Sequence, residues 1–127
     1  MRKRILLIDD NALIRGLVRL YIESRAGFEV CGEAADGVEG IEKEEELKPD
    51  LIVLDFSMPR ANGLQAAKIL HQVAPNTPII LLTIYKDAIP IRLARTSGVD
   101  SVLSKADQLT ILADEVQRLT AVYSGDG

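Results

Sequence analysis

Four apolar residues end on a carboxylate in the segment Leu51-Ile52-Val53-Leu54-Asp55. A second run of the same kind, Ile79-Ile80-Leu81-Leu82, ends on Thr83. Strands that are apolar at every position are typical of a parallel sheet that is covered by helices on both faces. We therefore expect these two segments to be central strands of an α/β domain.

Short β-branched runs alternate with longer segments of helical period along the whole chain, which indicates βαβ units. The expected strands are about 4–9, 28–34, 51–55, 78–83 and 100–104, and the expected helices are about 11–25, 36–47, 63–74, 87–97 and 107–123. Right-handed crossovers leave few arrangements for such a chain, and the order 2-1-3-4-5 is the commonest at this size. The sequence predicts a flavodoxin-like, doubly wound, five-stranded parallel sheet with helices on both faces.

The composition fits one domain over residues 1–127, because 127 residues with 47% hydrophobic content can bury a core without disulfides. The 19 acidic residues outnumber the 15 basic ones and no basic stripe is present, so we expect no nucleic-acid binding by this domain alone. No apolar run approaches the roughly 20 residues that span a bilayer, and we expect no membrane partner. The single cysteine, Cys31, is expected to be buried and inert, and a cytoplasmic location fits it best.

Five polar residues end apolar runs, namely Asp9, Asp10, Asp55, Thr83 and Lys105. The carboxyl ends of parallel strands meet at one edge of the sheet, so we expect these side chains to lie together. Three neighbouring carboxylates repel each other unless a cation compensates them, and hard divalent cations such as Mg²⁺ prefer oxygen ligands. A strand-end carboxylate beside Mg²⁺ can attack phosphorus and form an aspartyl-phosphate.

Each of these residues also has a simpler interpretation when it is taken alone. Asp9 or Asp10 could cap the helix that begins near Asn11. Thr83 could be an ordinary β-branched strand residue, and Lys105 an ordinary surface lysine. The joint occurrence of all of them favours a site.

The chain resembles the response-regulator receiver domains of two-component signalling, and the resemblance covers roughly residues 4–121. This resemblance depends on the order and spacing of four segments. They are Ile8-Asp9-Asp10-Asn11, Leu54-Asp55-Phe56-Ser57-Met58-Pro59 with Gly63, Leu82-Thr83, and Leu103-Ser104-Lys105. Because the residue after Lys105 is not proline, the chain is most similar to receivers that precede a helix-turn-helix output domain.

The resemblance implies a metal and phosphoryl site. Asp55 would be the phosphoacceptor, and Mg²⁺ would be bound by Asp10, Asp55 and the backbone carbonyl of Ser57. Asp9 would act through a metal-bound water. The protein would be a signalling phosphoacceptor rather than an enzyme, catalysing only its own phosphotransfer and autodephosphorylation.

The resemblance also implies how the phosphoryl group is delivered and held. Thr83 and Lys105 would contact it. The donor would be a sensor histidine kinase or a phosphotransfer protein, docking beside the first helix near Ile14, Arg15 and Val18.

Some positions depart from the family pattern. An aromatic residue is usual where this chain has Val102, and a small one is usual at Ile84, which could crowd access to Asp55 and slow phosphoryl transfer. Ser57 and Tyr85 occupy the positions that tune hydrolysis in this family. Neither would readily orient an attacking water, so we expect a long-lived phosphorylated state.

Phosphorylation would bias the loop 84–88 and the helix expected at 87–97 between two arrangements. This helix contains Pro90, which is tolerable only in a first turn, and we expect Asp87 as its cap. The readout surface, and the interface of a homodimer, would be formed by the helix at 87–97, the strand at 100–104 and the helix at 107–123.

Three other classes stay open. A haloacid-dehalogenase-type phosphatase also uses a strand-end aspartate, Mg²⁺ and a lysine, but this chain has Ser57 in place of the second aspartate that serves as the general acid. A flavodoxin-like cofactor protein needs a phosphate cradle, which Asp9 and Asp10 would oppose. A receiver-like scaffold that is never phosphorylated would be compatible with Ile84 and Val102.

Overall fold

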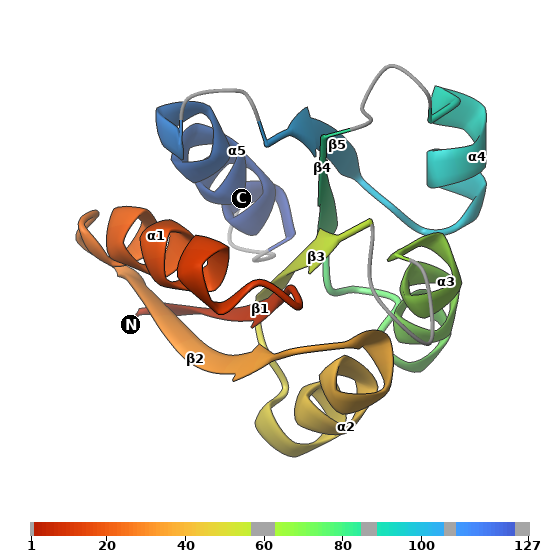
Figure 1. The fold of residues 1–127 in the computed structure, drawn as a ribbon, viewed down its shortest axis with the longest axis horizontal. Helices are drawn as coiled ribbons and strands as arrows, with labels where there is room; N and C mark the ends of the chain where they lie inside the picture. Colours follow the sequence, from red (N-terminus) through yellow and green to blue (C-terminus); the bar gives the residue numbers. More distant parts are fainter. Residues whose placement is uncertain (1, 57–62, 85–88, 106–108, 124–127) are drawn as a thin grey trace.

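The computed structural model describes residues 2–56, 63–84, 89–105 and 109–123. Five parallel strands form one sheet in the order β2-β1-β3-β4-β5, which confirms the predicted topology (Figure 1). The strands are β1 Lys3–Ile8, β2 Phe28–Ala34, β3 Leu51–Asp55, β4 Ile79–Thr83 and β5 Ser101–Ser104. The helices are α1 Ala12–Glu23, α2 Gly37–Leu47, α3 Gly63–Val73, α4 Ile91–Thr96 and α5 Leu109–Tyr123.

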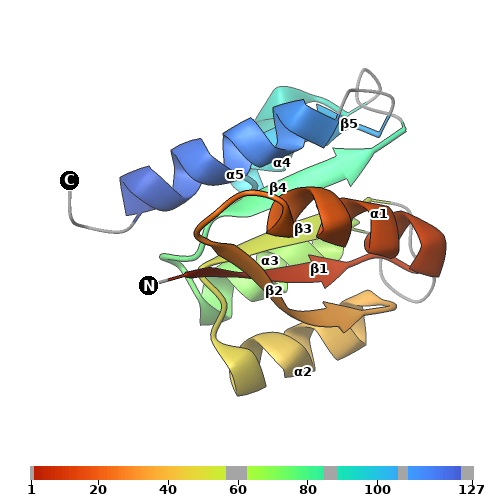
Figure 2. The same cartoon turned by 90° about the vertical axis from the view of Figure 1, so that its left-hand side faces the viewer.

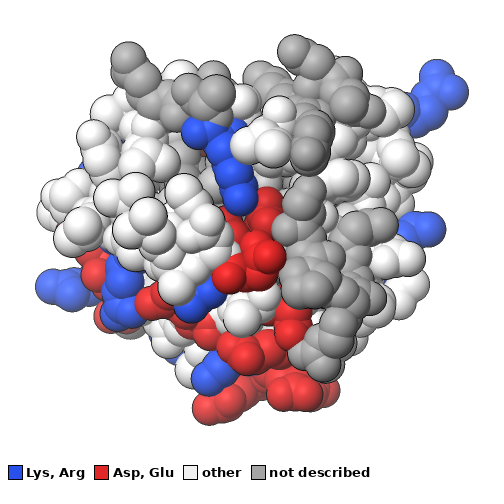
Figure 3. Space-filling view, in the orientation of Figure 1, with Lys and Arg blue, Asp and Glu red and all other residues white. Residues whose placement is uncertain are grey.

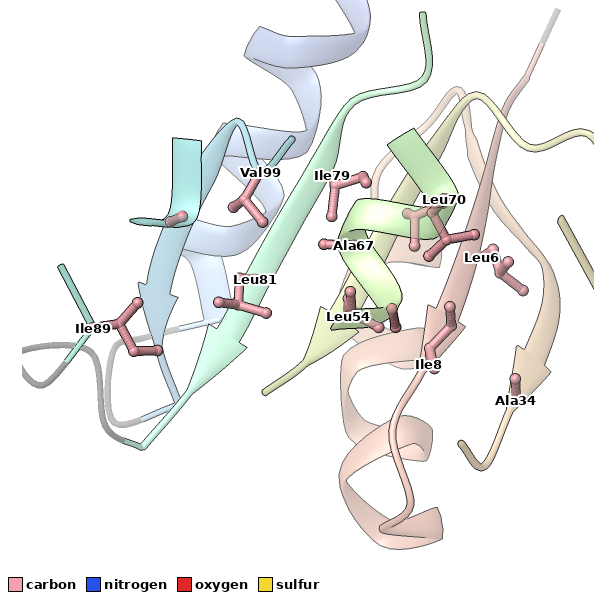
Figure 4. Packing of buried hydrophobic residues seen from close by; sticks show 13 residues of the cluster. Leu6, Ile8, Ala34, Leu54, Ala67, Leu70, Ile79, Leu81, Ile89 and Val99 are labelled. Atoms are coloured by element: carbon pink, nitrogen blue, oxygen red, sulfur yellow. The ribbon is translucent and has the colours of Figure 1, made fainter. Parts of the chain in front are cut away.

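The helices cover both faces of the sheet, α1 and α5 on one and α2, α3 and α4 on the other (Figures 1 and 2). Successive side chains of a strand point to opposite faces, so each central strand contributes to two cores. Ile5 and Leu7 pack with α1 and α5, whereas Leu6 and Ile8 pack with the helices of the other face. Figure 4 shows this second cluster, in which Leu70 of α3 lies over the sheet.

The fourth helix differs from its prediction. It runs over Ile91–Thr96 rather than 87–97, and Pro90 is its N-terminal flanking residue with φ −62° and ψ 130°. A proline disfavours the helical conformation in the residue before it, so Ile89 does not extend the helix. Asp87, which we expected as the cap, lies outside the described residues.

Two further expectations concern Cys31 and the membrane. Cys31 is only half-buried, so the prediction of a fully buried thiol is wrong. Burial nevertheless raises its pKa, which keeps the thiol in its less reactive neutral form. Within the described residues, no helix combines the length and the apolar character that crossing a bilayer requires.

Candidate functional site

Asp55 is the last residue of β3 and is 3% exposed. It is held at the sheet edge by its neighbours, because it lies opposite Leu82 of β4 and the next backbone amide, that of Phe56, donates to the Leu82 carbonyl. The start of α3 also lies against this strand end. The Gly63 amide donates to the Phe56 carbonyl at 2.8 Å, and a Cβ at Gly63 would lie 2.6 Å from the Asp55 carbonyl oxygen.

Asp9 and Asp10 follow β1, which pairs with β3 and so brings the two strand ends together. Asp9 is buried and Asp10 is exposed. The interpretation of either aspartate as the helix cap is wrong, because the Asn11 side chain accepts hydrogen bonds from the amides of Leu13 and Ile14. With Asn11 in that role, neither carboxylate is needed to cap α1.

The structure brings the three predicted carboxylates together. Asp9, Asp10 and Asp55 each offer an oxygen atom, and these oxygens all lie within 4.8 Å of one another. Acidic atoms gather at this edge in the centre of Figure 3, with a basic side chain reaching them. Three hard oxygen donors at this spacing fit a divalent cation such as Mg²⁺, which prefers carboxylate and carbonyl ligands.

Lys105 supplies a positive charge to this cluster. Its Nζ lies 3.0 Å from Oδ1 of Asp55 and 3.1 Å from Oδ2 of Asp9. Burial favours the neutral amine, but the hydrogen bond to Asp55 and the charge of Asp9 outweigh it, so the pKa of Lys105 is raised. The side chain therefore remains an ammonium at neutral pH. Its backbone amide donates to the Thr83 carbonyl at 2.9 Å, which ties the end of β5 to the end of β4.

The remaining predicted positions lie along the same edge or outside the described residues. Thr83 ends β4, is 1% exposed and lies opposite Ser104 of β5. Ile84 is 65% exposed, and Val102 is half-buried against the core of the α3 face. Ser57 lies outside the described residues, as do the other positions between 57 and 62 and between 85 and 88.

Sequence reasoning missed two residues beside the cluster. Nη1 of Arg15 donates to the backbone carbonyl of Asp9, and Nε of Arg15 donates to Glu33 of β2. From the sequence, Arg15 is expected on the docking face, and Glu33 has no expected role. They are 18 positions apart on different elements, so no helical or strand periodicity could pair them.

Residues 5–117 match the family described as the response regulator receiver domain, and the match covers most of the chain. The chain belongs to this family. The predicted resemblance is therefore confirmed.

Two curated relatives illustrate the match. The chain is 44% identical over 81 residues to the chemotaxis protein CheY of Thermotoga maritima, covering 64% of this chain and 67% of the relative. It is 31% identical over 115 residues to the response regulator protein VraR of Staphylococcus saprophyticus, covering 91% of this chain and 55% of VraR. The chain thus spans about half the length of VraR.

A solved structure gives the same result for the fold. The crystal structure of a LuxR-family two-component response regulator from Aurantimonas sp. SI85-9A1 superposes with a TM-score of 0.88 at 27% sequence identity. The superposition covers 96% of this chain and 87% of that chain.

Proposed function

We propose that this chain is a phosphoacceptor in which Asp55 receives a phosphoryl group from a phosphohistidine. The observation that carries the proposal is the position of Lys105, whose ammonium contacts Asp55 and Asp9 at the sheet edge where three carboxylates meet. A buried carboxylate on a strand end is held in one orientation, which favours in-line attack on phosphorus. The attacking atom is a carboxylate oxygen of Asp55, and the imidazole nitrogen of the donor is the leaving group.

The carboxylates are proposed to bind Mg²⁺ before the transfer. Asp10 and Asp55 would be direct ligands together with the backbone carbonyl of Ser57, and Asp9 would act through a bound water. When bound, Mg²⁺ neutralises the negative charge that gathers on the phosphoryl oxygens. Membership of the receiver family and the spacing of the oxygens of Asp9, Asp10 and Asp55 support this assignment.

Lys105 and Thr83 are proposed to hold the transferred group. The Lys105 ammonium can form a charge-assisted hydrogen bond to a phosphoryl oxygen, exchanging one of its carboxylate partners for the new anion. The Thr83 hydroxyl can donate a second hydrogen bond from the end of β4. Thr83 and Ile84 precede the segment that leads to α4. A shift of Thr83 towards the phosphoryl group would displace this segment and so change the surface formed by α4, β5 and α5.

The partner face is proposed to lie on α1. Leu13, Leu17 and Leu20 are 73%, 45% and 69% exposed, which is unusual for leucines on one helix of a globular domain. Beside them an apolar pocket of about 140 Å³ opens between Ile14 of α1 and Leu109 of α5. This surface is next to the phosphoacceptor edge and suits the helical part of a sensor histidine kinase or phosphotransfer protein.

We propose that α4, β5 and α5 form the surface through which the domain contacts an effector or a second copy of itself. Ile91 and Leu93 of α4 are 67% and 48% exposed, so apolar contact area is available there.

The cytoplasmic location also stays a prediction.

Intact-protein mass spectrometry after incubation with acetyl phosphate and Mg²⁺ tests the proposal. We expect the wild type to gain the mass of one phosphoryl group and Asp55→Asn to gain none, because the amide is not a nucleophile. Asp114→Asn is the matched control: it removes the same charge from an exposed position on α5 and should be phosphorylated like the wild type.

The same samples separate the other classes. A wild type that gains no mass, although it is folded and binds Mg²⁺, would support the non-phosphorylated scaffold and contradict the proposal. Release of many equivalents of phosphate per protein from an aryl phosphate would instead support a phosphatase.

A further inference from the structure

Arg15 and Glu33 form an ion pair beside the carboxylate cluster. Nε of Arg15 donates to Oε1 of Glu33 at 3.0 Å, and Nη1 of Arg15 donates to the carbonyl oxygen of Asp9 at 2.5 Å. Their side chains are 17% and 28% exposed. One guanidinium therefore joins α1 and β2 to the peptide group between Asp9 and Asp10.

Glu33 is itself held in place from α1. Its second oxygen, Oε2, accepts a hydrogen bond from Nη1 of Arg19 at 2.7 Å, and Nε of Arg19 lies 3.2 Å from Glu23. Burial of Glu33 favours its neutral acid, but the hydrogen bonds from Arg15 and Arg19 outweigh burial and lower its pKa. Both carboxylate oxygens of an ionised Glu33 therefore accept hydrogen bonds, and Glu33 in turn orients the Arg15 side chain.

We propose that Arg15, oriented by Glu33, is a positioning residue that fixes the Asp9–Asp10 peptide group and so prepares the two carboxylates for a divalent cation. The inference rests on the proposed function. Arg15 donates to the backbone of Asp9, whereas Lys105 contacts the Asp9 carboxylate. Fixing a peptide group fixes the Cα atoms on both of its sides, which lowers the ordering that cation binding must impose.

Glu33 has a second consequence for the cluster. A guanidinium without a partner would be attracted to the nearby carboxylates of Asp9 and Asp10, where it would compete with a cation. The contact with Glu33 balances the charge of Arg15 and keeps its side chain on the carbonyl. Loss of either member of the pair should therefore weaken cation binding.

Simple electrostatics predicts the opposite result for Arg15. A positive charge close to a cation site repels the cation, so its removal alone should tighten Mg²⁺ binding. A positioning role predicts that the same substitution weakens binding. The direction of the change therefore separates the two explanations.

The experiment is an Mg²⁺ titration of the unphosphorylated full chain, followed by the NMR shifts of its backbone amides at a temperature where every variant is folded. We expect Arg15→Gln and Glu33→Ala each to raise the Kd for Mg²⁺ about tenfold, a typical cost of losing a group that orients metal ligands. The double variant should lose little more, because both residues act through one contact. Arg92→Gln is the control, because it removes one positive charge from an exposed position on α4 that takes no part in these contacts, and we expect less than a twofold change.

Mg²⁺ binding by Arg15→Gln that equals or exceeds that of the wild type would overturn the inference, provided that Asp10→Asn abolishes binding. If Arg15→Gln does not fold, Arg15→Met decides the question by the same criterion, because it also removes the positive charge and the hydrogen bond to the Asp9 carbonyl but keeps most of the apolar stem. A wild type that shows no saturable binding, or an Asp10→Asn variant that binds as well as the wild type, would overturn the proposed cation site and this inference with it.

Discussion

Lys105 and Asp10 have opposite roles in the charge balance of the site. Lys105 forms ion pairs with Asp55 and Asp9, so two of the three carboxylates have a cation within 3.1 Å. Asp10 belongs to the same cluster but is exposed, and one ammonium cannot balance three negative charges. We expect this excess charge to destabilise the fold when no cation is bound, and to favour the binding of the divalent cation that we propose.

Asp10→Asn tests this balance, because the amide has nearly the same shape and carries no charge. Without divalent cations, we expect the variant to unfold with a free energy about 1 kcal/mol higher than the wild type, the size of one close repulsion in water. Mg²⁺ at ten times its Kd should add about 1.4 kcal/mol to the wild type and nothing to the variant. Urea unfolding with EDTA or MgCl₂ measures both quantities.

Glu42→Gln is the control, because Glu42 is an exposed acid on α2 that does not belong to the cluster. It should change neither value. An Asp10→Asn variant that is less stable than the wild type in EDTA would contradict the charge balance described above.

The secondary-structure elements were predictable where hydrophobic pattern decides them. All five strands and all five helices occur in the predicted order, because fully apolar runs such as Leu51-Ile52-Val53-Leu54 pack well only between two helical layers. The start of α4 was not predictable by pattern alone, because Pro90 decides it through local backbone sterics. The sequence could not select the cap of α1, because Asp9, Asp10 and Asn11 are all good caps and only the backbone geometry selects Asn11.

The sequence predicted which side chains meet at the candidate site, but it did not predict the contacts that hold them in place. Strand ends identified Asp9, Asp10, Asp55 and Lys105, because parallel topology brings those ends together. The role of Arg15 depends on a side chain that crosses from one element to another, and such contacts follow from packing rather than from spacing along the chain.

Gly63→Ala tests how α3 is joined to β3. The added Cβ would lie 2.6 Å from the Asp55 carbonyl oxygen and 2.7 Å from the Phe56 Cα, and these are backbone atoms that cannot rotate away. We expect a loss of about 1–3 kcal/mol in the free energy of unfolding, as for other overpacked positions, together with slower phosphorylation because Asp55 must shift.

Gly16→Ala is the matched control for this substitution. A Cβ at Gly16 meets nothing within 4 Å, and the residue is inside α1. Alanine should stabilise the fold by about 0.5–1 kcal/mol there, because it restricts the unfolded chain more than glycine does. Thermal or urea unfolding that gave the two alanine variants the same sign would contradict the assigned role of Gly63.

The whole molecule places the site where its topology reverses. The chain leaves β1 towards β2 on one side and returns to β3 on the other, so the ends of β1 and β3 lie side by side at the carboxyl edge of the sheet, where parallel α/β sheets usually bind ligands. Asp9 and Asp55 come from these two ends, and Lys105 comes from the end of β5. Side chains that are 96 positions apart in the sequence therefore meet on a scaffold whose two cores hold every strand in place.

Phosphorylation by acetyl phosphate over a range of Mg²⁺ concentrations, with the modified peptide identified by mass spectrometry, tests this account most directly. We expect one phosphoryl group on Asp55, formed only when Mg²⁺ is present, with half-saturation near the Kd measured for the unphosphorylated chain. Phosphorylation at an equal rate in EDTA, or a phosphoryl group on another residue, would contradict it.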